Sequence, residues 1–425
     1  MIAGVGGGGR RSATQIDGRA ISRVLVVSPR APWPPRGGLE LRPASLLLAL
    51  ADLGLEVGLA TFAARGGELM APGDLRVWVA ETNADGARPN ANLLDWVKTP
   101  DGHATDQWWT PRARAAVARA LADFDPQLVI LDGLWTRRVI PLVADGTGRR
   151  VVLCAHNVEG ALTVELAHSS AEEVPSALRA LVTRRTADIE GSVVAGVDQV
   201  WACSNHDAGL FGKHYADCAP VSVIPNVVPI PPARHSTADL EHPLLLFVGT
   251  LGYRPNADAA EWLATELLPR LSATGLDARL RVIGSGASAK LRGLARGRAV
   301  EITGYVDDLD AHLLEAAVVA LPFVAGGGTR FKALEAFANR IPVVSSAKGI
   351  EGLEARAGVH YLAAETAVEF ASAIAKTCSD RPRRAALIRH AYALVQTSYS
   401  QLAMREAVAT ALAALAHGAG RVRSR

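Results

Sequence analysis

A glycine-rich turn that runs into a short helix carries the residues of this chain most able to do chemistry. Residues 326–346 read G-G-G-T-R-F-K-A-L-E-A-F-A-N-R-I-P-V-V-S-S, with Arg330, Lys332 and Glu335 close to the helix start. The backbone N–H groups of such a turn and the positive end of a helix dipole both favour an anion. Cations at that end are disfavoured unless an anion neutralises them. The pattern therefore predicts a phosphate or diphosphate site.

The same segment also has a purely structural interpretation. Arg330 and Lys332 would be solvated, and Lys332 would pair with Glu335 along one helical turn. Glu335 borders the apolar face of the helix, where a buried carboxylate needs a bonding partner. The core face expected from the helical spacing consists of Phe331, Leu334, Ala338 and Ile341.

Length, composition and charge exclude several classes of protein. A chain of 425 residues with 49% hydrophobic residues favours two domains, each with a full core. The net charge of +3, without basic runs interleaved with aromatics, argues against nucleic acid. The cysteines lack metal-site spacing and suit a reducing cytosol; they are Cys154, Cys203, Cys218 and Cys378.

The ends of the chain give further expectations. Residues 1–20 are rich in Gly and Arg without an apolar core, so they read as a disordered leader and not as a signal peptide. No uninterrupted apolar run reaches the ~18 residues of a membrane-spanning helix. We therefore expect a cytoplasmic protein. Peripheral contact with the inner membrane face stays open, because the tail carries Arg421, Arg423 and Arg425.

Short apolar runs alternate with helical patterns along the whole chain, as in a parallel sheet covered on both faces. The expected strands of the first half are residues 24–28, 56–61, 128–132, 151–155, 199–203 and 221–224. The pattern restarts after a proline-rich stretch, with strands expected at 244–248, 279–283, 300–303, 318–322 and 342–345. Helices are expected at 44–53 and 257–271.

These runs predict an α/β chain with two doubly wound, Rossmann-like domains that face a cleft. The expected division is an N-terminal Rossmann-like domain at 21–228, a linker at 229–243 and a C-terminal Rossmann-like domain at 244–399. The Ala-rich helix at 400–418 is expected to pack back on the first domain. Ligands of such sheets bind at the carboxyl ends of the strands.

Several motifs in order resemble the GT-B glycosyltransferases, and within them the retaining group typified by glycosyltransferase family 4 (glycosyl transferases group 1). In the second half these motifs are F-V-G-T-L-G-Y-R-P-N (247–256), V-I-G-S-G (282–286), T-G-Y-V-D-D-L (303–309) and the glycine turn with its helix. In the first half they are G-G-L-E-L-R (37–42), A-H-N-V-E (155–159) and V-I-P-N-V-V (223–228). The resemblance implies the GT-B architecture for the whole chain, with residues 21–228 as the acceptor domain and residues 244–399 as the nucleotide-sugar-binding domain.

The resemblance also implies an activity. Such enzymes move a hexosyl or related sugar from a nucleotide-diphosphate sugar to an acceptor hydroxyl, here expected with retention and without metal or cofactor. Expected partners are the donor and a glycan, lipid-linked or small-molecule acceptor, with no nucleic acid. The Asp-x-Asp at Asp308 and Asp310 reads as a helix cap and not as a metal site.

Residue by residue, the resemblance assigns a donor site and a second loop. Glu335 would hold the ribose hydroxyls, since a carboxylate accepts two hydrogen bonds from a cis-diol. Residues 304–306 would contact the base. The expected donor-binding residues are Gly326, Gly327, Gly328, Thr329, Arg330, Lys332, Glu335, Gly249, Arg254, Gly304, Tyr305 and Val306. The expected acceptor and phosphate loop is Gly37 and Gly38.

His156 is the expected catalytic residue, because it follows an apolar strand and corresponds to the family's histidine beside the reacting sugar. Asn157 is expected to fix its ring, and Asp132 is a further candidate at the end of a neighbouring strand. A structural histidine and an ordinary strand-to-helix turn at Gly37 and Gly38 are the alternatives.

Two departures from the family pattern leave alternatives open. Gly327 stands where the family has the first Glu of its E-x7-E pair, a sugar contact. Thr250 follows Gly249 where many members have Arg, so we hypothesise that Arg330 and Lys332 replace that charge. A nucleotide-sugar-binding protein without transferase activity remains an alternative. A Rossmann-type NAD enzyme is another, although the V-I-G-S-G run lacks the full G-x-G-x-x-G.

Overall fold

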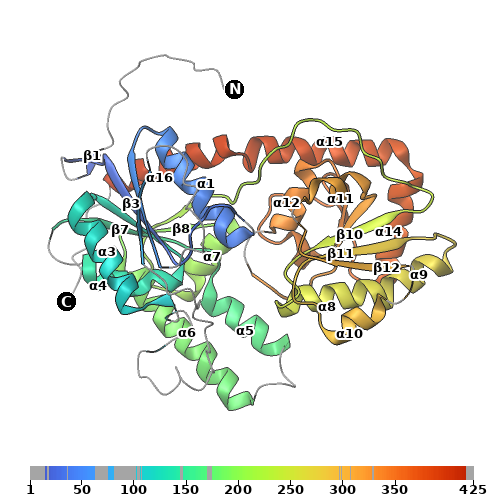
Figure 1. Cartoon of the computed structure of the whole chain (residues 1–425), viewed down its shortest axis with the longest axis horizontal. Helices are drawn as coiled ribbons and strands as arrows, with labels where there is room; N and C mark the ends of the chain where they lie inside the picture. Colours follow the sequence, from blue (N-terminus) through green and yellow to red (C-terminus); the bar gives the residue numbers. More distant parts are fainter. Residues whose placement is uncertain are drawn as a thin grey trace.

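The computed structural model shows two helix-covered parallel sheets (Figure 1). It describes residues 15–16, 19–35, 37–62, 75–80, 102, 106, 108–143, 147–169, 175–295, 297, 299–306, 308–327 and 330–417. We call the parts built around the first and the second sheet the N-terminal and the C-terminal domain. The doubly wound α/β architecture expected from the sequence is confirmed.

The sheet of the N-terminal domain has seven strands in the order β5-β4-β3-β6-β7-β8-β9, and all its pairs are parallel. Its central strands are completely buried, as strands covered on both faces must be. The strand order reverses between β3 and β6, which makes the carboxyl ends of these two strands the switch point. The strands are β3 (Arg23–Ser28), β4 (Glu56–Thr61), β5 (Arg76–Val79), β6 (Leu128–Asp132), β7 (Arg150–Cys154), β8 (Gln199–Ala202) and β9 (Val221–Val223).

Helices cover both faces of this sheet (Figure 1). They are α1 (Gly38–Asp52), α3 (Pro111–Phe124), α4 (Ile140–Val143), α5 (Glu159–Ser169), α6 (Ser176–Gly196) and α7 (Asn205–His214), with a 3₁₀ turn at Leu134–Val139. Ser204 caps α7 by accepting the N–H of Asp207. The two-residue strands β1 (Gln15–Ile16) and β2 (Arg19–Ala20) form a separate antiparallel pair.

The sheet of the C-terminal domain has six parallel strands in the order β12-β11-β10-β13-β14-β15. Its switch point lies between β10 and β13. The strands are β10 (Leu244–Val248), β11 (Arg279–Ile283), β12 (Val300–Gly304), β13 (Val318–Leu321), β14 (Val343–Ser345) and β15 (Leu362–Ala363). The helices are α8 (Arg254–Trp262), α9 (Leu268–Ala273), α10 (Ala289–Leu294), α11 (Asp310–Glu315), α12 (Phe331–Ala338), α13 (Ala347–Ile350), α14 (Ala367–Ser379), α15 (Arg381–Ser398) and α16 (Gln401–His417).

The expected elements and the observed ones agree closely where apolar runs are long. The helix expected at 257–271 is broken into α8, a π-helical turn at Leu263–Leu267 and α9. The short edge strands β5 and β15 were not predicted, because strands of four and two residues carry little periodicity.

Two connections join the domains. Residues 224–243 run between β9 and β10 without helix or strand. Helices α15 and α16 lead back from the C-terminal domain to the N-terminal one (Figure 1). Met404, Val408 and Leu412 of α16 are buried in one core with Leu46 and Leu50 of α1. The last helix is thus part of the core beneath the N-terminal sheet.

Arg42 fixes the start of the first connection. Its side chain is 1% exposed, and its Nη1 donates to the carbonyl of Ile224 at 2.9 Å and to Asn226 Oδ1 at 2.7 Å. A buried guanidinium needs such acceptors. Asn226 therefore anchors the chain where it leaves the N-terminal sheet.

Replacing Leu412 with Ala should lower the free energy of unfolding by about 2–4 kcal/mol, because it leaves a cavity between α16 and α1. Leu402→Ala is the control, since Leu402 on the same helix is 53% exposed and its truncation should cost less than ~0.5 kcal/mol. Urea denaturation followed by circular dichroism measures both. Equal midpoints for the two variants would show that α16 is not seated in this core.

Candidate functional site

The candidate site lies where the carboxyl ends of the two sheets approach each other. In the N-terminal domain the switch-point strands end at Ser28 and Asp132. In the C-terminal domain Gly249 follows β10, and the loop that contains Gly326 and Gly327 follows β13. All parallel strands of a sheet end at one edge, so these segments gather there although they are far apart in the sequence.

Lys332, Glu335 and Gly249 form the centre of the site on the C-terminal domain. A Cβ atom on Gly249 would lie 2.9 Å from Lys332 Cε, so the lysine stem runs directly along this backbone. The Lys332 ammonium lies 5.5 Å from the centre of the Phe323 ring. Among the described residues neither the ammonium nor the Glu335 carboxylate has a hydrogen-bonding or ion-pairing partner. The structural interpretation, in which these two side chains pair, is therefore wrong.

Burial sets the electrostatics of these two groups. It lowers the pKa of Lys332 to about 8, opposed by the negative charge of Glu335, while the positive charge of Arg330 acts in the same direction as burial. Burial also raises the pKa of Glu335, opposed by the charge of Lys332. A partly buried ammonium without a bonded anion is costly. The arrangement is suited to a ligand that brings negative charge to Lys332 and hydroxyl groups to Glu335.

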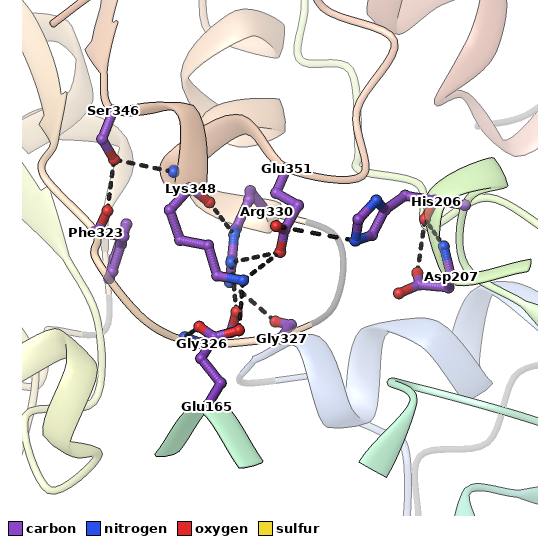
Figure 2. A network of polar contacts seen from close by, with 12 residues as sticks. Glu165, His206, Asp207, Phe323, Gly326, Gly327, Arg330, Ser346, Lys348 and Glu351 are labelled. Atoms are coloured by element: carbon purple, nitrogen blue, oxygen red, sulfur yellow. Dashed lines mark hydrogen bonds and ion pairs between the residues drawn. The ribbon is translucent and has the colours of Figure 1, made fainter. Parts of the chain in front are cut away.

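Arg330 is engaged in the structure of its own loop (Figure 2). Its guanidinium donates to three carbonyl oxygens, those of Gly326 at 2.6 Å, Lys348 at 2.8 Å and Gly327 at 3.0 Å. A phosphate contact of Arg330, as hypothesised from the sequence, would require some of these bonds to break. The charge of Lys332 is free of such bonds, so it is the better placed of the two cations.

The described part of the glycine turn contacts the N-terminal domain. Gly326 donates its N–H to Glu165 Oε1 of α5 at 2.6 Å. A Cβ atom on Gly327 would lie 2.9 Å from Asn157 Oδ1 and 3.1 Å from both methyl carbons of Leu162, so a side chain there would require Asn157 and Leu162 to shift. Gly327, which stands where the family pattern has a glutamate, thus lies where the two domains approach each other closely. Gly328 and Thr329 lie outside the described residues.

The V-I-G-S-G run of the sequence supports the turn after β10. Leu251 donates its N–H to the carbonyl of Ser285 at 2.7 Å, and a Cβ atom on Gly284 would come within 1.9 Å of the Gly249 carbonyl oxygen. These glycines serve contact between two backbone segments, which explains the motif without a bound dinucleotide.

The remaining residues assigned to the donor site lie at or after the carboxyl ends of β10 and β12. Gly304 accepts the N–H of Gly284 at 2.8 Å, Tyr305 is 57% exposed, and Val306 packs against the core. Arg254 begins α8 and pairs with Asp258 at 3.4 Å. Their predicted contacts with the donor stay predictions.

The predicted acceptor and phosphate loop at Gly37 and Gly38 contacts the C-terminal domain. Gly37 precedes α1, and a Cβ atom on Gly38 would lie 2.7 Å from the ring of Phe331 at the start of α12. The structure therefore brings the two glycine segments of the sequence analysis to the same junction between the domains.

His156 is held by Asp132 at the switch point of the N-terminal sheet. His156 Nε2 lies 2.6 Å from Asp132 Oδ1, and Ser28 Oγ donates to Asp132 Oδ2 at 2.7 Å. The Trp135 ring packs edge-on against the imidazole at 5.4 Å. We assign the proton to Nε2 because it faces a carboxylate, which leaves Nδ1 as an acceptor. The expectation that Asn157 fixes the ring is wrong, since its amide donates to Glu159 Oε1.

Several polar residues of this junction were missed by sequence reasoning. Glu190 of α6 is 1% exposed and accepts the N–H groups of Glu159 and Gly160, both at 2.8 Å, so it holds the first turn of α5 in place. Burial raises its pKa to about 7. Glu165 and Lys348 join the domains by an ion pair. In the sequence they are ordinary helical charges, and no local pattern distinguishes them.

The described residues contain neither a cluster of metal-binding side chains nor a helix that could cross a membrane. No group of three or more histidine, cysteine or acidic side chains among them is arranged to hold a metal ion. None of the helices they form has the length and apolar character needed to cross a bilayer.

The match to known families covers both domains. Residues 37–227 match the family model described as glycosyl transferase 4-like domain, and residues 242–380 match that described as glycosyl transferases group 1. No curated protein is similar enough by sequence to count as a relative of this chain.

Solved structures of similar shape are numerous. Sucrose-phosphate synthase from Thermosynechococcus elongatus has a TM-score of 0.74 at 17% identity, covering 93% of this chain and 99% of its own. HepE from Anabaena, solved with UDP-glucose, has a TM-score of 0.63 at 14% identity and covers 92% and 99%. A glycosyltransferase from Rickettsia africae ESF-5 has a TM-score of 0.62 at 14% identity and covers 94% and 99%.

The fold, the two family matches and the junction between the sheets agree with one another. The chain belongs to the group 1 glycosyltransferases, enzymes with the two-domain GT-B fold.

Proposed function

We propose that this glycosyltransferase binds a nucleoside-diphosphate sugar on its C-terminal domain and transfers the sugar to an acceptor hydroxyl at the junction. The observation that carries the donor site is the pair of half-buried charges at Lys332 and Glu335, which have no hydrogen-bonding or ion-pairing partner among the described residues and lie beside the backbone of Gly249. A diphosphate near Lys332 and ribose hydroxyls near Glu335 would satisfy both groups.

In the proposed reaction, negative charge develops on the departing diphosphate close to the Lys332 ammonium. Cleavage of the bond between the sugar and the diphosphate builds charge on the departing phosphate. A pre-positioned ammonium at Lys332 stabilises that charge. His156 would accept a hydrogen bond from a sugar hydroxyl through Nδ1, while Asp132 and Ser28 keep its ring oriented. The contacts between the domains would exclude water, which would otherwise hydrolyse the donor.

The finer points of the proposal come from the family resemblance. They are retention at the anomeric carbon, activity without a metal ion, and an acceptor that is a glycan, a lipid-linked saccharide or a small molecule. HepE was solved with UDP-glucose, so UDP is the first nucleotide to test. A binding protein without transfer activity is the rival. Release of the nucleoside diphosphate from its sugar, measured with each donor that binds, distinguishes the two.

Glu335→Ala should weaken binding of the preferred nucleoside diphosphate by about 10–100-fold, the range for a lost hydrogen bond to a charged group. Calorimetric titration with UDP, GDP, ADP and TDP identifies that nucleotide first. Glu266→Ala is the control, because this exposed glutamate of the π-helical turn lies outside the site. Binding that is the same in both variants would remove Glu335 from the donor site. Binding of none of the four would count against the proposed donor class.

The affinity for a nucleoside diphosphate should fall as the pH rises through about 8, the pKa to which burial lowers Lys332. Below that pH Lys332 carries the charge that attracts the diphosphate, and above it the free protein loses that charge. The decrease approaches about tenfold per pH unit. Lys332→Arg provides the comparison, because a guanidinium stays charged throughout. A pH dependence of calorimetric affinity that is equal in both proteins between pH 7 and 9 would exclude Lys332.

His156→Ala and Asp132→Asn should both reduce the rate of nucleoside-diphosphate release by on the order of 10²-fold, with little change in donor affinity. The asparagine keeps the shape of Asp132 but no longer favours the Nε2–H tautomer. Steady-state rates and calorimetric affinities, measured together, separate the two effects. A loss of affinity without a loss of rate would assign His156 to binding alone.

A further inference from the structure

A network of charged side chains joins the domains beside the glycine turn (Figure 2). Four of them, Glu165, Arg330, Lys348 and Glu351, lie next to the turn, and His206 of α7 lies 3.9 Å from Glu351. Glu165 reaches from α5 of the N-terminal domain to the start of the turn. Its Oε1 accepts the N–H of Gly326 at 2.6 Å, and its Oε2 accepts from Lys348 Nζ of α13 at 2.6 Å. Lys348 Nζ also contacts Glu351 at 2.6 Å, and Glu351 lies 3.5 Å from Arg330. The Glu165 carboxylate of the N-terminal domain thus contacts both Gly326 of the turn and Lys348 of the C-terminal domain.

The charges in this network balance. Arg330 and Lys348 are positive, and Glu165 and Glu351 are negative. The exposed fractions of these side chains lie between 10% and 30%, so water screens them only in part. Without Glu165, two cations and the Gly326 N–H would face a single carboxylate. Removing Glu165 therefore leaves an excess of positive charge at the start of the turn.

The position of the Glu165 carboxylate is that of a bound anion. A backbone N–H and an ammonium converge on it at hydrogen-bonding distance, which is how proteins bind phosphates and carboxylates. Arg330 is fastened to the carbonyls of Gly326 and Gly327 and keeps this N–H in place. The start of the turn is therefore an anion site that the protein fills with its own side chain.

We propose that Lys348 and the N–H of Gly326 form an additional anion subsite of the donor site, which Glu165 occupies in the free protein and leaves when the donor binds. This inference rests on the proposed function and adds an internal competitor to it. The anionic diphosphate of a nucleoside-diphosphate sugar is the group that takes the place of the carboxylate. Because Glu165 belongs to α5, its displacement also breaks its ion pair with Lys348, so donor binding exchanges this contact between the domains for a contact with the donor.

Two substitutions should change donor affinity in opposite directions. Glu165→Ala removes the competitor and should tighten binding of the preferred nucleoside diphosphate by about three- to tenfold, the scale of one partly exposed ion pair. Lys348→Met removes a cation of the subsite and should weaken binding by a similar factor. The double variant should differ from Lys348→Met by less than Glu165→Ala differs from the wild-type protein, because Glu165 has lost its ion pair once Lys348 is replaced.

Calorimetric titration with the same four nucleoside diphosphates measures these affinities in the full chain. Glu266→Ala is the matched control, since it removes one negative charge outside the junction and should leave affinity unchanged. Added salt should narrow the difference between the wild-type protein and Glu165→Ala, because it weakens the ion pair that holds the competitor. Circular dichroism confirms that each variant is folded.

The outcomes separate the inference from the proposed function. If the wild-type protein binds a nucleoside diphosphate and Glu165→Ala binds it equally or more weakly, Glu165 is no competitor and the inference fails alone. If Glu165→Ala and Lys348→Met both tighten binding, the ion pair only restrains the domains and Lys348 is not part of the subsite. If no nucleoside diphosphate binds to any of these proteins, the proposed donor site fails together with the inference.

Discussion

The burial of parallel strands on both faces is the constraint on which the rest of this structure depends. Apolar strands such as β6 and β10 can be covered by helices on both sides only if the chain returns to the same end of the sheet after each strand. All strands then finish at one edge, and the loops that follow them meet there. Each of the two sheets offers such an edge, and the chain places these edges against each other.

Charge compensation at that junction follows two patterns. Arg330, Lys348, Glu165 and Glu351 neutralise one another within the protein. Lys332 and Glu335, one turn apart on α12, have no bonded partners among the described residues, and burial shifts the pKa of each toward its neutral form. A folded protein tolerates such a pair where a ligand supplies the missing partners. In the proposed donor site Lys332 and Glu335 are therefore available at once, whereas Lys348 becomes available only when Glu165 leaves it.

The connections between the domains make the junction adjustable. Arg42 fixes the first connection to the N-terminal core through Ile224 and Asn226, and α16 is buried in the same core. Between the facing edges the contacts are instead small and polar, as at Glu165 and Gly326, or depend on glycine, as at Gly327 and Gly38. Firm anchors behind the junction and exchangeable contacts across it suit an enzyme that must admit a donor and then exclude water.

The sequence by itself determined the elements and the chemistry of single motifs. Alternating apolar runs predicted both sheets, and the glycine turn with Lys332 and Glu335 indicated an anion site, because strand period, glycine and charge are local properties. Only the tertiary structure decided the partners within the protein: Asp132 and not Asn157 for His156, three carbonyl oxygens for Arg330, and Glu165 for Gly326. Such contacts join residues more than a hundred positions apart or depend on side-chain direction. Neither is encoded in spacing along the chain, so they follow only from the way the two sheets meet.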